Sequence, residues 1–463
     1  MSGAPRPPGG ADDALFTDLY ELTMAAAYLA DGNRGTATFE LWVRDPDERN
    51  FLVAAGLETA LRYLEDFRFD EAALSYLGSL GRFSPGYLEF LSGLRFTGEV
   101  WAMPEGTIAF VQEPLLRVTA PIIEAQIVET YLLNAVGFQT LIASQAARVT
   151  LASAGRSWVD FGARRAHGVD AALGAARSAW LAGAAGTSLV LAGRDHGLPL
   201  AGTMAHSYVL SHPSEREAFL SFARTFPDDA MLLIDTFDTL EGARAAAEAA
   251  RVLAAEGIRV TGVRLDSGDL ATLSSVVRAI LDEAGFPGIR ILASGGLDEH
   301  SVARLVATAA PIDGFGVGTR LVTGGDDPSL DAVYKLVQDQ RGPQMKTSTG
   351  KVTLPGVKQA YRVEEAGLLQ ADTLALADET GVPGWPLLHR VMSNGRRLDP
   401  PEPPAAARER CRAGLASLPE PLRSLEAAAA PPVGISPGLA RLARDLAAER
   451  AAAPASPPAG QSH

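Results

Sequence analysis

The chain has 463 residues, 47% hydrophobic and 21% charged, which predicts about two or three folded domains and excludes a disordered chain or a disulfide-stapled miniprotein. Lys and Arg number 41 against 55 Asp and Glu, so the net charge of −14 argues against nucleic acid or an anionic membrane as a partner. The single cysteine, Cys411, excludes an intramolecular disulfide and a cysteine-based zinc site, and without a signal-peptide pattern or a membrane-length apolar run we expect a cytoplasmic protein.

The first part of the chain, residues 11–120, is predicted to be a small α+β domain. Residues 15–32 (LFTDLYELTMAAAYLADG) and 56–67 have the apolar spacing of helices. A long helix over residues 121–146 then leads into the next domain. The predicted strands of the first domain lie at 37–44, 98–106 and 114–118.

Residues 121–330 are predicted to form an irregular, TIM-like α/β barrel. Short apolar runs alternate there with helical stretches such as 239–256 and 270–284, which is typical of βα units around a parallel sheet. The number of runs and the lack of a central dinucleotide-binding fingerprint favour a barrel over a doubly wound sheet. The predicted strands are 157–162, 186–193, 200–206, 231–237, 260–266, 289–296 and 314–319.

The C-terminal residues 399–463 are low in complexity and rich in Ala and Pro. Such runs bury too little apolar area to offset the entropy of ordering, so we expect a loose tail. Residues 438–452 have apolar residues at helical spacing and predict a short surface helix within it.

Two glycine-containing turns follow the last two predicted strands. In barrels the loops after the late strands present backbone N–H groups to a phosphate, and glycine allows close approach. The alternative is that these turns need glycine for geometry alone. The candidate phosphate-binding residues are Ser294, Gly295, Gly296, Gly316, Gly318 and Thr319.

The LDSGD run places Asp266 and Asp269 close to Arg264 at one predicted strand end. Carboxylates there can bind ribose hydroxyls or a Mg²⁺ that holds a diphosphate. The alternative is that one of them caps the helix that begins at residue 270. Asp235 follows another strand and has the same two interpretations.

Two further strand ends carry basic residues. Arg164 and Arg165 are suited to an anion or to solvated ion pairs. His206, between Thr203 and Ser207, can be a base, a phosphate donor, a phosphorylated nucleophile or a structural histidine. No metal-ligand spacing such as HExxH accompanies it, so we assign no metal ligands.

Over about residues 11–362 the chain resembles the nicotinate phosphoribosyltransferases, the type II phosphoribosyltransferases of NAD salvage. The resemblance rests on the motifs LFTDLYELTMAAAYL, FELWVR, GLETALRYLE, EAQIVETYLLN, DFGARRAHG, GTMAHSYV, LLIDTFDT, GVRLDSGDL, ASGGLDE, GFGVGT and MKTSTGKVTLPG. It implies an α/β barrel carrying the phosphoribosyl site, with residues 331–398 returning to pack on the N-terminal domain. It also implies a homodimer with active sites near the subunit interface.

The reaction that the resemblance implies joins nicotinate to phosphoribosyl pyrophosphate, giving nicotinate mononucleotide and pyrophosphate, with Mg²⁺ and coupled ATP hydrolysis. It implies that Tyr20 packs on the pyridine ring, Thr203 and Arg264 contact nicotinate, Thr319 contacts the phosphoribosyl phosphate, and ATP phosphorylates His206. A guanidinium suits a carboxylate such as nicotinate. We assign His206, Asp266 and Asp269 to catalysis, and Tyr20, Arg164, Arg165, Thr203, Ser207 and Arg264 to substrate binding.

The four lysines of the chain all lie between residues 335 and 358, at Lys335, Lys346, Lys351 and Lys358. Their clustering in a chain that otherwise uses arginine points to a nucleotide phosphate or to a solvated strand or loop.

Three other functions are open. Nicotinamide phosphoribosyltransferase shares the fold, but a neutral amide has no negative charge for paired arginines to bind. Quinolinate, a dicarboxylate, needs more basic residues than these strand ends carry. A non-catalytic phosphoribosyl-binding barrel would not need Asp266, Asp269 and His206 together, and any turnover would exclude it.

Overall fold

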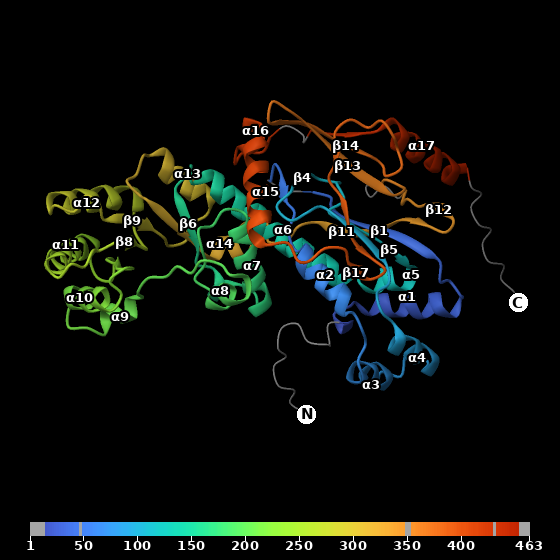
Figure 1. Cartoon of the computed structure of the whole chain (residues 1–463), viewed down its shortest axis with the longest axis horizontal. Helices are drawn as coiled ribbons and strands as arrows, with labels where there is room; N and C mark the ends of the chain where they lie inside the picture. Colours follow the sequence, from blue (N-terminus) through green and yellow to red (C-terminus); the bar gives the residue numbers. More distant parts are fainter. Residues whose placement is uncertain (1–13, 46–48, 348–352, 429–431, 453–463) are drawn as a thin grey trace, which may run out of the picture.

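Two sheets organise the chain: a seven-stranded sheet that combines distant parts of the sequence and a five-stranded parallel sheet from its middle. The computed structural model describes residues 14–45, 49–347, 353–428 and 432–452. Figure 1 shows the parallel sheet with its helices on the left and the seven-stranded sheet on the right. The protein is therefore a mixed α/β fold with two bodies along its long axis.

The seven-stranded sheet has the order β12-β11-β1-β5-β3-β16-β17. Late strands join early ones, because β11 pairs antiparallel with β1 and β16 pairs antiparallel with β3. β1 (TATFELWV) is buried at every position after its first, as its aromatic and aliphatic residues favour. The strands are β1 (Thr36–Val43), β3 (Glu99–Ala102), β5 (Leu116–Pro121), β11 (Ala332–Asp339), β12 (Gly342–Pro343), β16 (His389–Ser393) and β17 (Arg396–Arg397).

Helices and two small sheets surround this sheet. In α2 the residues at helical spacing, Ala60, Leu61, Tyr63 and Leu64, are buried. The helices are α1 (Leu19–Ala30), α2 (Leu57–Asp66), α3 (Glu71–Ser79) and α4 (Pro85–Gly93). The small sheets contain β2 (Leu52–Val53) with β4 (Ile108–Ala109), and β13 (Lys358–Glu365) with β14 (Leu368–Leu376), β15 (Trp385–Pro386) and β18 (Val433–Ile435).

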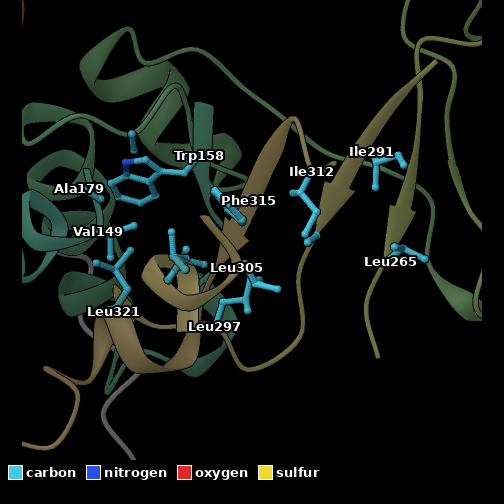
Figure 2. Packing of buried hydrophobic residues seen from close by; sticks show 14 of the residues in the cluster. Val149, Trp158, Ala179, Leu265, Ile291, Leu297, Leu305, Ile312, Phe315 and Leu321 are labelled. Carbon is cyan, nitrogen blue, oxygen red and sulfur yellow. The ribbon is translucent and has the colours of Figure 1, made fainter. Parts of the chain in front are cut away.

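The parallel sheet has the order β6-β10-β9-β8-β7 and is flanked by helices. Figure 2 shows Trp158 of β6 and Phe315 of β10 packed with Val149 and Ala179 from the neighbouring helices. The strands are β6 (Ser157–Asp160), β7 (Met231–Leu233), β8 (Gly262–Leu265), β9 (Arg290–Ala293) and β10 (Gly314–Val317). The helices are α7 (Val169–Leu181), α9 (His206–Leu210), α10 (Glu215–Thr225), α11 (Thr239–Ala255), α12 (Leu270–Glu283), α13 (Glu299–Ala307) and α14 (Thr319–Val322).

Two of the seven predicted barrel strands are wrong. These segments contribute only isolated parallel bridges, from Thr187 to Asp160 and from Leu200 to Thr187, so the described sheet has five strands and is not closed. Residues after Thr187 instead form α8 (Val190–His196), with Ala192 buried. A short apolar run cannot be assigned to a strand or a buried helix by periodicity alone, which explains the error.

The prediction of a loose tail from residue 399 is wrong for its first part. Residues Pro404–Ser417 form α15, with Cys411 buried, and Arg408 donates to the carbonyl oxygen of Ala184 at 2.7 Å. Short Ala side chains let this helix approach so closely that a Cβ on Gly106 would lie 2.1 Å from the Ala407 oxygen. α16 (Glu420–Arg423) follows, and the predicted surface helix is present as α17 (Pro437–Ala452). Residues 429–431 and 453–463 of the predicted tail lie outside the described residues.

The lysines that the structure describes differ in their surroundings. Lys358 is buried, and its Nζ lies 2.8 Å from the Glu40 carboxylate and 2.9 Å from the Leu354 oxygen. Burial lowers the pKa of Lys358, although the charge of Glu40 opposes this. Lys358 therefore ties β13 to β1 and is neither a solvated residue nor a phosphate ligand, which corrects both interpretations for it. Lys346 is exposed, and Lys351 lies outside the described residues.

The predicted long helix is divided into α5 (Ile122–Ile127) and α6 (Glu129–Ala152), and α1 docks where they meet. The buried Glu21 accepts hydrogen bonds from the Thr130 backbone N–H at 3.1 Å and its hydroxyl at 2.5 Å. Burial raises the pKa of Glu21 to about 7, against the hydrogen bonds from Thr130 and Thr17. No helix among the described residues is long and apolar enough to cross a lipid bilayer.

Replacing Glu21 by Gln is expected to flatten the pH dependence of stability. Because the folded-state pKa of Glu21 is raised, its contribution to stability is complete below about pH 4.5 and is lost as pH rises through about 7. The free energy of unfolding, measured with urea, should therefore rise in Glu21→Gln relative to wild type by about 1 kcal/mol or more between about pH 5 and pH 8. The exposed Glu89→Gln is the control, and an unchanged slope in Glu21→Gln would contradict the assignment.

Candidate active site

The carboxyl ends of the parallel strands bring together the polar residues that follow them. The centre of this group is Arg264 in β8. Its Nε donates to Ser294 Oγ at 2.7 Å, one terminal nitrogen donates to Thr203 Oγ1 at 3.0 Å, and the other donates to Asp266 Oδ1 at 2.7 Å. Two of its five N–H groups have no partner among the described residues. Arg264 is thus held rigidly and can still bind an anion.

Ser294 and Arg264 keep Asp266 ionised. The Ser294 hydroxyl donates to Asp266 Oδ1 at 2.6 Å. Partial burial opposes the charge, but the hydrogen bond from Ser294 and the charge of Arg264 outweigh it and lower the pKa of Asp266. Ser294, assigned from the sequence to phosphate binding, is buried and serves as a partner of these two charged groups.

His206 stands at the first position of α9, between two of these strand ends. Its Nδ1 lies 3.2 Å from Thr236 Oγ1, and its Nε2 lies 3.9 Å from Asp266 Oδ2. The imidazole is half-exposed, so one edge is oriented by the protein while the ring remains accessible. This placement suits a nucleophile or a proton carrier.

Asp235 and Asp269 have different roles. Asp235 Oδ2 accepts from the Asp266 backbone N–H at 2.9 Å and from Ser267 Oγ at 2.7 Å, whereas its buried Oδ1 has no partner among the described residues. Asp269 is the N-cap of α12, with both carboxylate oxygens bonded to Thr272. The capping alternative therefore holds for Asp269, which has no contact with Arg264 or His206 in the described part of the chain.

The four glycines of these two turns differ in the space around them. At Gly295 (φ +95°) a Cβ would lie 1.9 Å from the Asp266 carbonyl oxygen, and at Gly316 it would lie 2.6 Å from the Phe161 ring. Packing alone explains these two glycines. Gly296 (φ +68°) faces open space, Gly318 leaves 3.2 Å to the nearest atom, and Thr319 is exposed beside it. Gly296, Gly318 and Thr319 are therefore the positions at which a phosphate can approach the backbone.

If a phosphate binds here, alanine at Gly296 is expected to raise the KM for the phosphorylated substrate about two- to tenfold, because one backbone hydrogen bond to that phosphate is weakened. Steady-state kinetics measure the effect. Gly285→Ala is the matched control, since Gly285 also has a positive φ (+89°) and open space but follows α12 at the opposite end of the strands. An equal change in both variants would show that backbone strain causes the effect, and it would contradict the binding of a phosphate at Gly296.

The turn after β6 places an aromatic ring and two arginines at this edge. Asp160 is buried and holds the turn by accepting from the Gly162 backbone N–H at 2.8 Å. The Phe161 ring centroid lies 5.2 Å from the guanidinium carbon of Arg264, a contact that sequence analysis missed. The aromatic residue directly after a strand and before Gly162 was the available signal. Arg164 and Arg165 are exposed and have no ion pair among the described residues.

Ser207 and Tyr20 are not joined to this group. Ser207 is exposed beside His206, and its hydroxyl has no partner among the described residues. Tyr20 lies on α1, which Figure 1 shows on the right with the seven-stranded sheet, whereas β8 lies on the left. One chain therefore does not bring Tyr20 to Arg264.

Comparison with known proteins agrees with this architecture. A crystal structure of human nicotinic acid phosphoribosyltransferase superposes with a TM-score of 0.82 and 31% sequence identity, covering 93% of this chain and 99% of that one. A nicotinate-nucleotide pyrophosphorylase from Pyrococcus furiosus, at 24% identity and a TM-score of 0.71, shares the fold. The chain is thus an α/β enzyme with its candidate site at the carboxyl ends of parallel strands.

Sequence comparison identifies the family. Residues 15–137 match the nicotinate phosphoribosyltransferase N-terminal domain, and residues 157–340 match the nicotinate phosphoribosyltransferase family. A nicotinate phosphoribosyltransferase of Mycobacterium tuberculosis is 52% identical over 415 residues, 89% of both chains, and one of Bacillus subtilis is 43% identical over 385 residues, covering 80% of this chain and 78% of that one. The chain belongs to the nicotinate phosphoribosyltransferase family.

Proposed function

We propose that this enzyme converts nicotinate and phosphoribosyl pyrophosphate into nicotinate mononucleotide and pyrophosphate, in NAD salvage in the cytoplasm. The observation that carries the proposal is Arg264, whose guanidinium is fixed by three partners, lies beside Phe161 and keeps two N–H groups without a partner in the described part of the chain. These groups fit the carboxylate of nicotinate, and the adjacent aromatic ring fits its pyridine. The relatives named for the same activity support it.

The protein contributes to the transfer step mainly by aligning the two reactants, and it forms no covalent bond with either of them. The pyridine nitrogen forms a bond to the ribose carbon as the bond to pyrophosphate breaks, and positive charge develops on the sugar ring. Arg264 orients the ring through its carboxylate, and Gly296, Gly318 and Thr319 hold the phosphate at the other end of the sugar. Holding both reactants in register supplies most of the acceleration.

ATP hydrolysis is coupled through His206. An imidazole nitrogen forms a bond to the γ-phosphorus, the bond to the β,γ-bridging oxygen breaks, and ADP leaves; water later hydrolyses the phosphohistidine to inorganic phosphate. Thr236 and Asp266 orient the ring for this step.

Asp235 and Asp266 are the residues that would hold Mg²⁺. Asp235 Oδ1 is buried without a partner among the described residues, and Asp266 is ionised and lies on the neighbouring loop. Mg²⁺ in phosphoryl sites is held by one or two carboxylates together with substrate phosphates, so two suffice. The bound ion would neutralise charge on the leaving pyrophosphate.

The protein acts as a homodimer in which Tyr20 reaches the partner's site. Support comes from the distance between α1 and β8 within one chain and from Phe16, Leu19 and Tyr20, which are 44%, 45% and 46% exposed on one short stretch. Sedimentation equilibrium should give the mass of two chains, and a fully active monomer would contradict the dimer.

The activity is tested by incubating the protein with nicotinate, phosphoribosyl pyrophosphate, Mg²⁺ and ATP. Mass spectrometry should find nicotinate mononucleotide, with pyrophosphate in equal amount, and ADP should accumulate. Without ATP the yield of nicotinate mononucleotide should fall. A purified, folded dimer that forms no nucleotide under either condition would refute the proposed activity.

A further inference from the structure

The helix that carries His206 is too short to hold its own orientation. α9 has five residues, and isolated helices shorter than about 12 residues are not stable in water. The orientation of His206 therefore depends on what α9 packs against. Met204 before the helix and Val209 within it are buried in the hydrophobic core around the parallel sheet. These two contacts alone would still allow α9 to rotate about the line that joins them.

Tyr208 supplies a third contact, on another side of α9. Residues two apart on a helix point in nearly opposite directions, so the Tyr208 side chain leaves the helix on the side away from His206. Its ring meets the Phe222 ring of α10 edge-on, with 5.8 Å between the centroids and 71° between the planes. Its hydroxyl donates to Ser221 Oγ at 3.2 Å. Tyr208 thus joins α9 to α10, which Figure 1 shows beside it.

α10 is anchored independently of α9. It has 11 residues, and Ser214 caps its first turn by accepting from the Glu217 backbone N–H at 3.2 Å. Phe219 is fully buried in the core, and α10 packs along α11. Phe222 is in turn packed on Phe226, with 5.1 Å between the ring centroids. The Tyr208 ring therefore rests on a support that does not itself depend on the short helix.

We propose that Tyr208 is a positioning residue that holds His206 in the orientation in which its imidazole attacks the γ-phosphorus of ATP. The inference rests on the proposed function, in which ATP phosphorylates His206. Tyr208 contributes no group to that step and acts through the backbone of α9. Nicotinate and phosphoribosyl pyrophosphate are assigned to residues of other loops, such as Arg264, so their use should not depend on Tyr208.

Single-turnover labelling with γ-labelled ATP tests this role. In Tyr208→Ala the rate constant of labelling at saturating ATP should fall about 10- to 100-fold, because displacing a reacting group by about 1 Å has an effect of that size. The ATP concentration that gives half the maximal rate should change little. Tyr208→Phe keeps the ring contact and should retain most of the rate. Phe222→Leu should also slow labelling, and the double variant should be no slower than Tyr208→Ala, because both changes remove the same contact.

His212→Ala is the matched control. The His212 ring lies 4.5 Å from the Tyr208 ring, and its Nδ1 donates to the Tyr208 carbonyl oxygen at 2.8 Å. His212 follows Tyr208 on the same segment and has no hydrogen bond or ring contact with α10 in the described part of the chain. Its removal leaves α9 joined to α10, so labelling should keep the wild-type rate.

The possible failures of this proposal and of the proposed function give different results. A wild-type rate of labelling in Tyr208→Ala would overturn the positioning role and leave phosphorylation of His206 in place. A loss of ATP-independent phosphoribosyl transfer as large as the loss of labelling would show that Tyr208 has a general structural role, which also overturns the proposal. A wild-type protein that takes up no label would refute phosphorylation of His206, and the positioning role with it.

Discussion

Replacing His206 by Ala is expected to abolish labelling of the protein by γ-labelled ATP. In the mechanism that we propose, the wild-type imidazole, which lies beside Thr236 and Asp266, accepts the phosphoryl group, and the resulting phosphohistidine should lose its label in acid. His206→Ala has no nitrogen at that place, so both the label and ATP hydrolysis should disappear. Some ATP-independent phosphoribosyl transfer should remain, because aligning nicotinate with the ribose carbon does not require the phosphoryl group.

His212→Ala is the control for that experiment. His212 lies just after α9, and its Nδ1 is 2.8 Å from the Tyr208 carbonyl oxygen, without contact to Asp266 or Thr236 in the described residues. Labelling should be unaffected in this variant. Label on another residue, or intact ATP hydrolysis in His206→Ala, would show that His206 is a structural histidine.

Replacing Arg264 by Ala is expected to raise the KM for nicotinate about 10- to 150-fold. A charge-assisted hydrogen bond to a carboxylate contributes about 1.5–3 kcal/mol, which corresponds to that range. The variant also leaves Asp266 without its guanidinium partner, so the pKa of Asp266 should rise towards its ordinary value. The KM for phosphoribosyl pyrophosphate should change less than that for nicotinate.

The matched control is Arg259→Ala. Arg259 is exposed and precedes the same strand, β8, at its opposite end. Equal losses for nicotinate and phosphoribosyl pyrophosphate in Arg264→Ala, with Arg259→Ala unaffected, would move Arg264 to the phosphate side of the site or to a structural role.

Much of the candidate active site could be predicted, because the carboxyl ends of the strands in a parallel sheet lie at the same edge. Arg264 and Asp266 lie at the end of a correctly predicted strand, β8, whereas His206 begins α9 after a segment that was wrongly predicted as a strand, and the structure brings all three together. The sequence could not decide between alternatives that depend on side-chain direction. Asp269 faces Thr272 as a cap, and Ser294 turns inward to Arg264.

The errors arise where packing overrides local pattern. The apolar run at Val190 folds as a helix, and the Ala-rich segment around Cys411 is ordered because small side chains allow close contact with Gly106. The pairing of Lys358 with Glu40 joins residues that are distant in sequence, so no local motif reports it.

Substrate discrimination tests the central claim most directly. Initial rates are compared for nicotinate, nicotinamide and quinolinate, each with phosphoribosyl pyrophosphate, Mg²⁺ and ATP. If Arg264 selects one carboxylate on a pyridine ring, kcat/KM for nicotinate should exceed that for nicotinamide by about 10-fold or more, the difference made by one charge-assisted hydrogen bond. Quinolinate should be a poor substrate. Equal or better use of nicotinamide or quinolinate would contradict the account.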